Sequence, residues 1–184
     1  MAEPNPMIAP GIGAAAANLV TVLAERGLWV ATAESCTGGL IAAAITSIPG
    51  SSAVFGWGLV TYANEAKAAL LGVRGQTLVQ HGAVSEQTAL EMATGVRRVA
   101  GADIGIATTG VAGPDGGTVT KPVGLVWVGV ASAKGVRAIR LDLTALSGGD
   151  GDVARQRIRH AAATRALQAA TTEARAIGDR LANT

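Results

Sequence analysis

The chain has 184 residues, of which 49% are hydrophobic and 15% charged, and its formal net charge at pH 7 is +2. This length suits one domain with a sizeable core and is short for two. The composition excludes a disordered or coiled-coil chain, and 25 glycines favour a compact α/β domain with many tight turns. One phenylalanine, one tyrosine, three tryptophans and no basic stripe argue against nucleic-acid binding.

Cys36 is the only cysteine, so an internal disulfide is excluded and a reducing compartment is expected. The N-terminal residues lack the basic segment and the apolar segment of a signal peptide. No apolar run reaches the roughly 18 residues of a membrane span. We therefore expect a cytoplasmic protein without a membrane partner.

The first elements are predicted as follows. Residues 1–13 form a flexible leader, and residues 14–27 form an amphipathic helix that Gly27 ends. Its apolar face carries Leu19, Val22 and Leu23. A short strand follows at 28–33, and a second helix begins near Gly38.

The later elements alternate in the same way. They are a strand at 54–62, helices at 64–72 and 83–101, strands at 102–110, 123–132 and 136–144, and a long helix from about Val153. Asn64 and Ser85 are predicted helix caps. The order indicates one three-layer α/β/α domain with a mixed β-sheet over residues 14–170, and residues 171–184 are the end of the last helix or a tail.

Polar and glycine residues collect where three predicted strands end. They stand in "ESCTGG" (34–39), "TYANEAK" (61–67) and "TTGVAGPDGG" (108–117). In open α/β sheets, ligands bind beyond the carboxyl ends of the strands. The three segments together therefore predict a ligand or active site.

Ser35 has two interpretations. It is either the cap of the helix that follows, or a nucleophile next to helix N–H groups that stabilise an oxyanion. Gly38 and Gly39 permit close approach of the backbone to a ligand. The two histidines, His81 and His160, have no acidic partner in the pattern, which argues against a Ser-His-Asp triad.

Lys67 is the alternative base. A lysine that is shielded from water near a helix N-terminus has a lowered pKa and can take a proton, with Tyr62 relaying it or orienting the substrate. The competing interpretations are a solvated lysine and a half-buried tyrosine with a satisfied hydroxyl. The residues alone do not decide between the catalytic and the non-catalytic interpretation of Lys67 or of Tyr62.

The other reactive groups carry weaker signals. Cys36 is interpreted as packing or as a wall of the site, and the role of Glu34, capping or orienting, stays open. The loop at 110–117 is either an anion-binding nest or a set of turns. No His, Cys or carboxylate residues stand at metal-ligand spacing, so neither a metal nor another cofactor is expected.

At these residues the chain resembles the C-terminal domain of the competence-damage-inducible proteins (CinA). Four motifs carry the resemblance, in the family's order and spacing, and it covers roughly residues 14–170. They are "AESCTGGLIA" (33–42), "TYANEAKAALLGV" (61–73), "HGAVSEQTALEMA" (81–93) and "TTGVAGPDGGTVTKPVGLVWVGVA" (108–131). Standalone members of this family act as nicotinamide-nucleotide amidases.

The resemblance implies deamidation of nicotinamide mononucleotide to nicotinic acid mononucleotide and ammonia, a step of pyridine-nucleotide salvage. It implies Ser35 as nucleophile, Lys67 as base and Tyr62 as the third catalytic residue. It also implies a homo-oligomer, a dimer or higher. The substrate-binding residues expected on this basis are Glu34, Cys36, Thr37, Gly38, Gly39, Asn64, Thr109, Gly110, Gly113 and Arg155.

The chain departs from the family pattern in two respects. Gly151 stands where an arginine of a Gly-Asp-Arg triplet is usual, although Arg155 still matches the pattern. The N-terminal pyrophosphatase-type domain of many relatives is lacking. These departures keep two alternatives open: a non-catalytic nucleotide-binding or interaction domain of the same fold, and hydrolysis of a different small amide.

Overall fold

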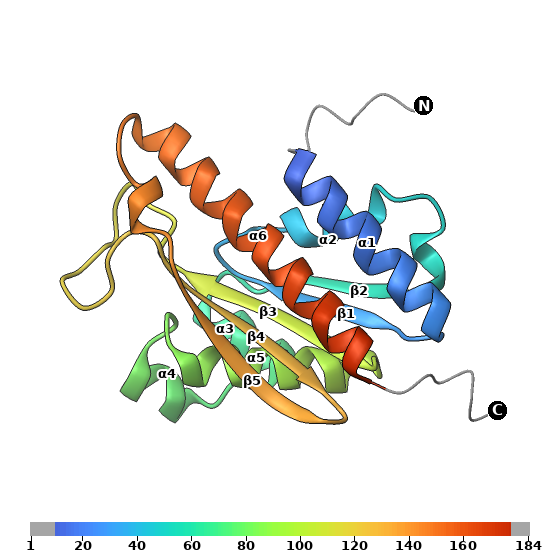
Figure 1. The fold of residues 1–184 in the computed structure, drawn as a ribbon. Coiled ribbons are helices and arrows are strands. Elements are labelled where there is room, and N and C mark those ends of the chain that lie inside the picture. The colour runs from blue at the N-terminus through green and yellow to red at the C-terminus, as the bar shows by residue number, and fades with distance from the viewer. Residues whose placement is uncertain (1–9, 178–184) are drawn as a thin grey trace.

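A computed structural model of the chain describes residues 10–177 (Figure 1). The helices are α1 (Pro10–Arg26), α2 (Leu40–Thr46), α3 (Asn64–Leu71), α4 (Gly75–His81), α5 (Glu86–Ala100) and α6 (Gly151–Ala176), with short 3-10 turns η1 (Ser51–Ala53) and η2 (Thr144–Leu146). The strands are β1 (Val30–Glu34), β2 (Phe55–Val60), β3 (Ile104–Gly110), β4 (Leu125–Ser132) and β5 (Gly135–Asp142). Within this range no helix combines the length and apolarity needed to cross a bilayer.

The five strands form one mixed sheet in the order β2-β1-β3-β4-β5. β1 runs parallel to both of its neighbours, whereas β3–β4 and β4–β5 are antiparallel pairs. Glu34, the last residue of β1, is in register with Val60 of β2 and Thr108 of β3. The carboxyl ends of the three parallel strands therefore meet at one edge of the sheet.

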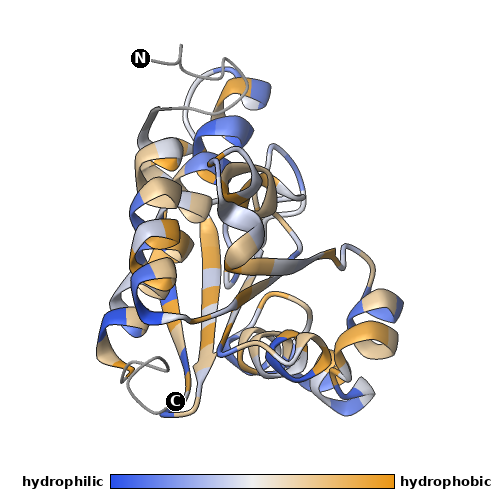
Figure 2. Cartoon of the chain, turned by 90° about the vertical axis from the view of Figure 1, so that its right-hand side faces the viewer, coloured by the Kyte–Doolittle hydropathy of each residue, from blue (hydrophilic) through white to orange (hydrophobic). Residues whose placement is uncertain are grey.

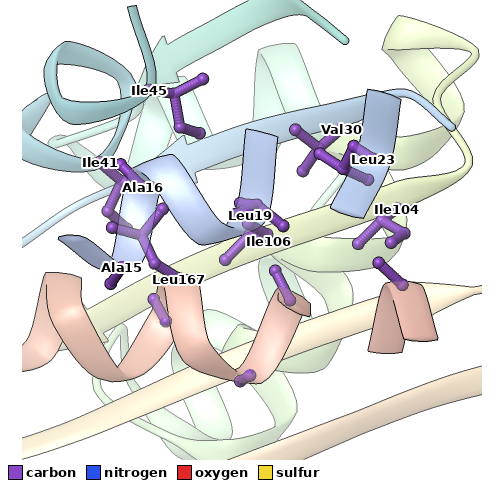
Figure 3. Close-up of a cluster of buried hydrophobic side chains, with 14 of the residues drawn as sticks. Ala15, Ala16, Leu19, Leu23, Val30, Ile41, Ile45, Ile104, Ile106 and Leu167 are labelled. Carbon is purple, nitrogen blue, oxygen red and sulfur yellow. The ribbon is translucent and has the colours of Figure 1, made fainter. Parts of the chain in front are cut away.

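Helices cover both faces of the sheet, which confirms the predicted three-layer domain (Figure 1). Side chains of α1, α2 and α6 pack on one face over Val30, Ile104 and Ile106, as the close-up of this core shows (Figure 3). Side chains of α3 and α5 cover Ala31, Ala33 and Ala107 on the other face. Figure 2 shows mainly hydrophobic colours in the strands between these helix layers.

α5 lies unusually close to the sheet and to α3, because three glycines leave room for it. A Cβ on Gly105 of β3 would lie 2.3 Å from the Ala93 carbonyl oxygen, and one on Gly129 of β4 would lie 2.2 Å from that of Ala89. A Cβ on Gly95 of α5 would lie 2.1 Å from the Leu71 carbonyl oxygen. Real side chains do not fit at these distances, so the absence of a Cβ sets the spacing of the layers.

The predicted first helix is confirmed, but it begins earlier than expected. Leu19, Val22 and Leu23 are buried, and Gly27 ends the helix with φ of +64°. The helix already starts at Pro10, so residues 10–13 of the predicted leader are helical. Proline suits a first helical turn, where its missing N–H has no partner to lose. The rest of that leader lies outside the described residues.

Two helix predictions need correction. The cap position of α3 is Ala63, and Asn64 is already in the first turn and makes no capping hydrogen bond. α4 was not predicted, because its seven residues are too few to show a helical period. Ser85 caps α5 as predicted, accepting from the Thr88 N–H.

The last part of the chain also differs in detail. α6 begins at Gly151, with the Asp150 carboxylate as its cap, and not at Val153. Residues 171–176 belong to this helix, and residues 178–184 lie outside the described range. β5 is an edge strand, as its alternation predicted. β4 is buried, so its apolar residues offer no surface for the self-association that they suggested in the sequence.

Candidate active site

The turn between β1 and α2, residues 35–39, carries the candidate nucleophile; we call it the Ser35 turn. The Ser35 N–H donates to the Thr108 carbonyl at 3.0 Å, which ties the start of the turn to β3. The Gly38 N–H donates back to the Ser35 carbonyl at 3.1 Å. Gly38 and Gly39 have φ of +60° and +93°, in the left-handed region that favours glycine. This conformation leaves Ser35 partly exposed at the end of the sheet.

The buried carboxylate of Glu34 caps α2. It accepts from the N–H groups of Gly39 and Ile41 at 3.0 and 3.1 Å, from that of Ala42 at 2.9 Å, and from the Thr37 hydroxyl at 2.7 Å. A negative charge at a helix N-terminus is favourable, because the first N–H groups have no partner within the helix. The open role of Glu34 is therefore capping, and the cap interpretation of Ser35 is wrong.

Lys67 points into the protein beneath the Ser35 turn. Its side chain is 1% exposed, so the solvated interpretation is wrong. Nζ donates to Ser35 Oγ at 3.2 Å and to the carbonyls of Thr61 and Tyr62, both at 2.9 Å. Burial lowers the pKa of Lys67, while the nearby Cys36 and Glu65 act in the opposite direction. The structure thus brings the predicted nucleophile and the predicted base together.

Tyr62 and Arg155 lie at the exposed side of this pair. Tyr62 is 61% exposed, which corrects the expectation of a half-buried side chain. Its hydroxyl accepts from Arg155 Nη2 at 3.3 Å, and Arg155 Nη1 donates to the Gly113 carbonyl. Arg155 therefore connects α6 with the end of β2 and with the loop after β3.

Two contacts to Thr37 were not found from the sequence. The Thr37 and Thr108 hydroxyls lie 2.7 Å apart, and Arg159 Nη2 donates to the Thr37 carbonyl at 2.9 Å. Two signals in the sequence were available. Arg159 follows Arg155 by four residues and so shares its helix face, and Thr108 lies on the α2 side of β3 by strict alternation.

Cys36 is a packing residue. It is 5% exposed and belongs to a cluster with Ala112, Val126 and Ile158, which confirms the packing interpretation. Burial raises the pKa of the thiol to about 12. The thiolate is the reactive form of cysteine, so this thiol is a poor nucleophile at neutral pH.

Three other predicted residues make no side-chain hydrogen bond to Ser35 or Lys67. Asn64 is exposed on the first turn of α3. The Thr109 hydroxyl donates to the Ala83 carbonyl at 2.7 Å, on the opposite face of β3 from Thr108. A Cβ on Gly110 would lie 2.7 Å from the Leu125 carbonyl oxygen, which accounts for this glycine by strand packing.

The sequence profile of the CinA C-terminal domain matches residues 13–173, almost the whole described structure. The chain belongs to the CinA C-terminal domain family. This confirms the resemblance from which the site residues were inferred. The matched residues include the Ser35 turn, Lys67, Arg155 and Arg159.

Relatives of two lengths match this family domain. A nicotinamide-nucleotide amidohydrolase PncC of Enterobacter agglomerans is 54% identical over 82% of this chain and 88% of its own length. A putative competence-damage inducible protein of Acetivibrio thermocellus is 57% identical over 65% of this chain, but the match spans only 30% of that longer protein. The crystal structure of the competence/damage inducible protein CihA from Agrobacterium tumefaciens, 44% identical, covers 92% of this chain and 96% of its own with a TM-score of 0.81.

Proposed function

We propose that this chain is an amidohydrolase that converts nicotinamide mononucleotide to nicotinic acid mononucleotide and ammonia. The observation that carries the proposal is the hydrogen bond between the buried Lys67 and Ser35. A lysine that is shielded from solvent is held beside a serine hydroxyl, which is the arrangement of a Ser–Lys nucleophile pair. The name of the Enterobacter agglomerans relative supports the choice of substrate.

Lys67 is arranged to work as a neutral base. The carbonyls of Thr61 and Tyr62 accept two N–H bonds from Nζ, so a neutral amine keeps its lone pair for Ser35. Burial favours this neutral form by lowering the pKa of Lys67. The position therefore supplies both the orientation and the protonation state that general-base catalysis needs.

The reaction follows from these positions. Ser35 Oγ attacks the carboxamide carbon as its proton moves to Lys67 Nζ, and a tetrahedral intermediate forms. The C–N bond then breaks, Lys67 returns the proton to the leaving nitrogen, and ammonia departs. Water, deprotonated by the same amine, then attacks the Ser35 ester. The ester bond breaks, Lys67 returns the proton to Ser35 Oγ, and the acid product leaves as a carboxylate after losing its own proton to solvent.

The Ser35 turn offers two N–H groups for the oxyanion of the intermediate. The Gly38 N–H is engaged with the Ser35 carbonyl, and the Gly39 N–H with the Glu34 carboxylate. In the part of the chain that the structure describes, the N–H groups of Cys36 and Thr37 donate to no main-chain carbonyl of another residue. We therefore assign the oxyanion contacts to the N–H groups of Cys36 and Thr37.

Tyr62 and Arg155 are proposed to hold the nucleotide. Tyr62 is exposed and Arg155 is partly exposed, the Tyr62 carbonyl accepts from Lys67 Nζ, and the Arg155 guanidinium keeps donors beyond its two protein contacts. Guanidinium groups bind phosphate well, so Arg155 is the proposed phosphate contact. At Gly151, where the resemblance implies an arginine, a Cβ would lie 2.9 Å from Pro114 Cβ, so a side chain at this position would require Pro114 to shift.

Ammonia release from nicotinamide mononucleotide tests the proposal, with Ser35→Ala as the comparison and calorimetry to measure nucleotide binding. We expect turnover in the native protein and none in the variant, while the variant still folds and binds the nucleotide. Turnover that persists in Ser35→Ala would place the nucleophile elsewhere. Binding without turnover in the native protein would favour the non-catalytic domain, and turnover of another amide alone would change the substrate.

The expected homo-oligomer is a separate proposal. β2 is an edge strand, and Trp57 and Val60 on it are 48% and 51% exposed. An exposed apolar edge strand favours pairing with another strand. Light scattering should give a multiple of the 18.3 kDa chain mass, and a strictly monomeric mass would contradict this expectation.

A further inference from the structure

Arg159 reaches the Ser35 turn from α6, 122 residues further along the chain than Thr37. Its Nη2 donates to the Thr37 carbonyl at 2.9 Å, and its Nη1 donates to the Gln156 side chain at 3.0 Å. A Cβ on Gly38 would lie 3.2 Å from Nη2, so the missing side chain of Gly38 lets the guanidinium lie against the turn. Arg159 is half-buried there.

The contact holds one peptide group from both sides. The Thr37 carbonyl and the Gly38 N–H belong to the same peptide plane, and the N–H donates to the Ser35 carbonyl at 3.1 Å. The Thr37 carbonyl also accepts from the Leu40 N–H at 3.3 Å, and Arg159 gives it the shorter of the two hydrogen bonds, so the plane cannot rotate without losing hydrogen bonds. The preceding peptide carries the Thr37 N–H that we assign to the oxyanion, so its direction depends on this anchoring.

Arg159 also places a positive charge beside the turn. Among residues 10–177, no carboxylate lies within ion-pair distance of its guanidinium. This charge acts on the turn through the Cys36 thiol. Burial is the main influence on the pKa of that thiol and raises it, and the charge of Arg159 is one of the influences that lower it. A positive charge that stabilises an anion at Cys36 also stabilises an oxyanion formed beside the same turn.

We infer that Arg159 is a positioning residue for the amidase step: it anchors the Thr37–Gly38 peptide so that the oxyanion donors of the Ser35 turn stay aligned. This inference rests on the proposed function. Misplacement of reacting groups by a fraction of a bond length slows an enzyme without weakening ground-state binding. The effect of removing Arg159 therefore belongs in kcat and not in KM.

The test measures kcat and KM for nicotinamide mononucleotide in Arg159→Ala and Arg159→Lys, with Arg165→Ala as the matched control. Arg165 lies on the exposed side of the same helix and contacts Gln168. We expect kcat to fall about 10- to 100-fold in Arg159→Ala with KM within about twofold. Arg159→Lys should retain part of the rate, added guanidinium should restore part of the Arg159→Ala rate, and Arg165→Ala should behave as the native protein.

Equal kcat in folded Arg159→Ala and native protein would overturn the inference. A rise in KM with unchanged kcat would also overturn it, because Arg159 would then be a substrate contact. If Arg159→Ala does not fold, the ratio of kcat between Arg159→Lys and native protein decides in its place. Absence of turnover in the native protein would defeat the proposed function instead. In that case the rate at which a fluorophosphonate labels Ser35, compared between native protein and Arg159→Ala, still tests the positioning role.

Discussion

Lys67 Nζ lies 3.2 Å from Ser35 Oγ, although the two residues are 32 positions apart in the chain. The strands that precede them explain this. Val60 is in register with Glu34, and the Thr61 N–H donates to the Glu34 carbonyl at 2.8 Å. Strands β1 and β2 therefore end at the same level of the sheet. The geometry of the pair is thus set by the hydrogen-bond register of two parallel strands, which is more rigid than a meeting of loops.

The rate should rise with pH as Lys67 loses its proton. Burial lowers the pKa of Lys67, so the midpoint of this rise should lie below the ordinary lysine value of about 10.4. Because the neutral amine is the base, the rate falls on the acid side of the midpoint and not on the alkaline side. A pH profile of kcat/KM measures it. Lys67→Arg should be inactive at every pH, since a guanidinium does not deprotonate in this range.

Glu65 should tune that midpoint. Its charge is one of the two groups that raise the pKa of Lys67 against the effect of burial. Glu65→Gln should therefore move the midpoint to lower pH, and by less in high salt because Glu65 is exposed. Glu86→Gln, an equally exposed acid on the first turn of α5, is the control and should leave the profile unchanged. A shift to higher pH would contradict the assignment of Lys67 as base.

Glu34→Ala should destabilise the fold by about 3 kcal/mol. The substitution leaves the N–H groups of Gly39, Ile41 and Ala42 without their carboxylate acceptor at a buried helix start. Glu34→Gln should lose less, since its amide keeps one acceptor oxygen but turns an NH₂ group toward donors. Urea unfolding gives both values. A loss below about 0.5 kcal/mol in Glu34→Ala would mean that water replaces the carboxylate without cost.

Gly129→Ala should be among the most disruptive single changes in the sheet. The new Cβ would lie 2.2 Å from the Ala89 carbonyl oxygen, so α5 would have to move away from β4. We expect a loss of about 3 kcal/mol in the free energy of unfolding. Gly75→Ala, where nothing lies within 4 Å of the new Cβ, should stay within about 0.5 kcal/mol of the native protein. Equal stability of the two variants would refute the close-packing argument.

Much of the architecture could be predicted from the sequence, because the strands and the amphipathic helices have clear periods. The buried face of α1 and the Ser85 cap are local features of this kind. α4 was missed because it is too short for a period. The cap of α2 was not predicted, because Glu34 is in the preceding strand, whereas caps are sought next to the helix.

The burial of Lys67 could not be predicted, because it depends on strand register. Its neighbours on α3, Glu65 and Leu70 among them, are exposed, so nothing in the local pattern distinguishes this lysine from a solvated one. Arg159 was missed for a similar reason. Its four-residue spacing from Arg155 places it on the same helix face, but the contact with the Thr37 carbonyl depends on the packing of α6 against the Ser35 turn.

The last helix of the chain supplies the two guanidinium groups of the site, Arg155 and Arg159, and the same helix packs against α1 in the main core. Ser35 and Lys67 are synthesised long before it. A nascent chain that has emerged only as far as Asp150 lacks both arginines, so the Thr37 carbonyl has no guanidinium donor. Under the proposed function, the chain would therefore become catalytically competent only when α6 completes the core.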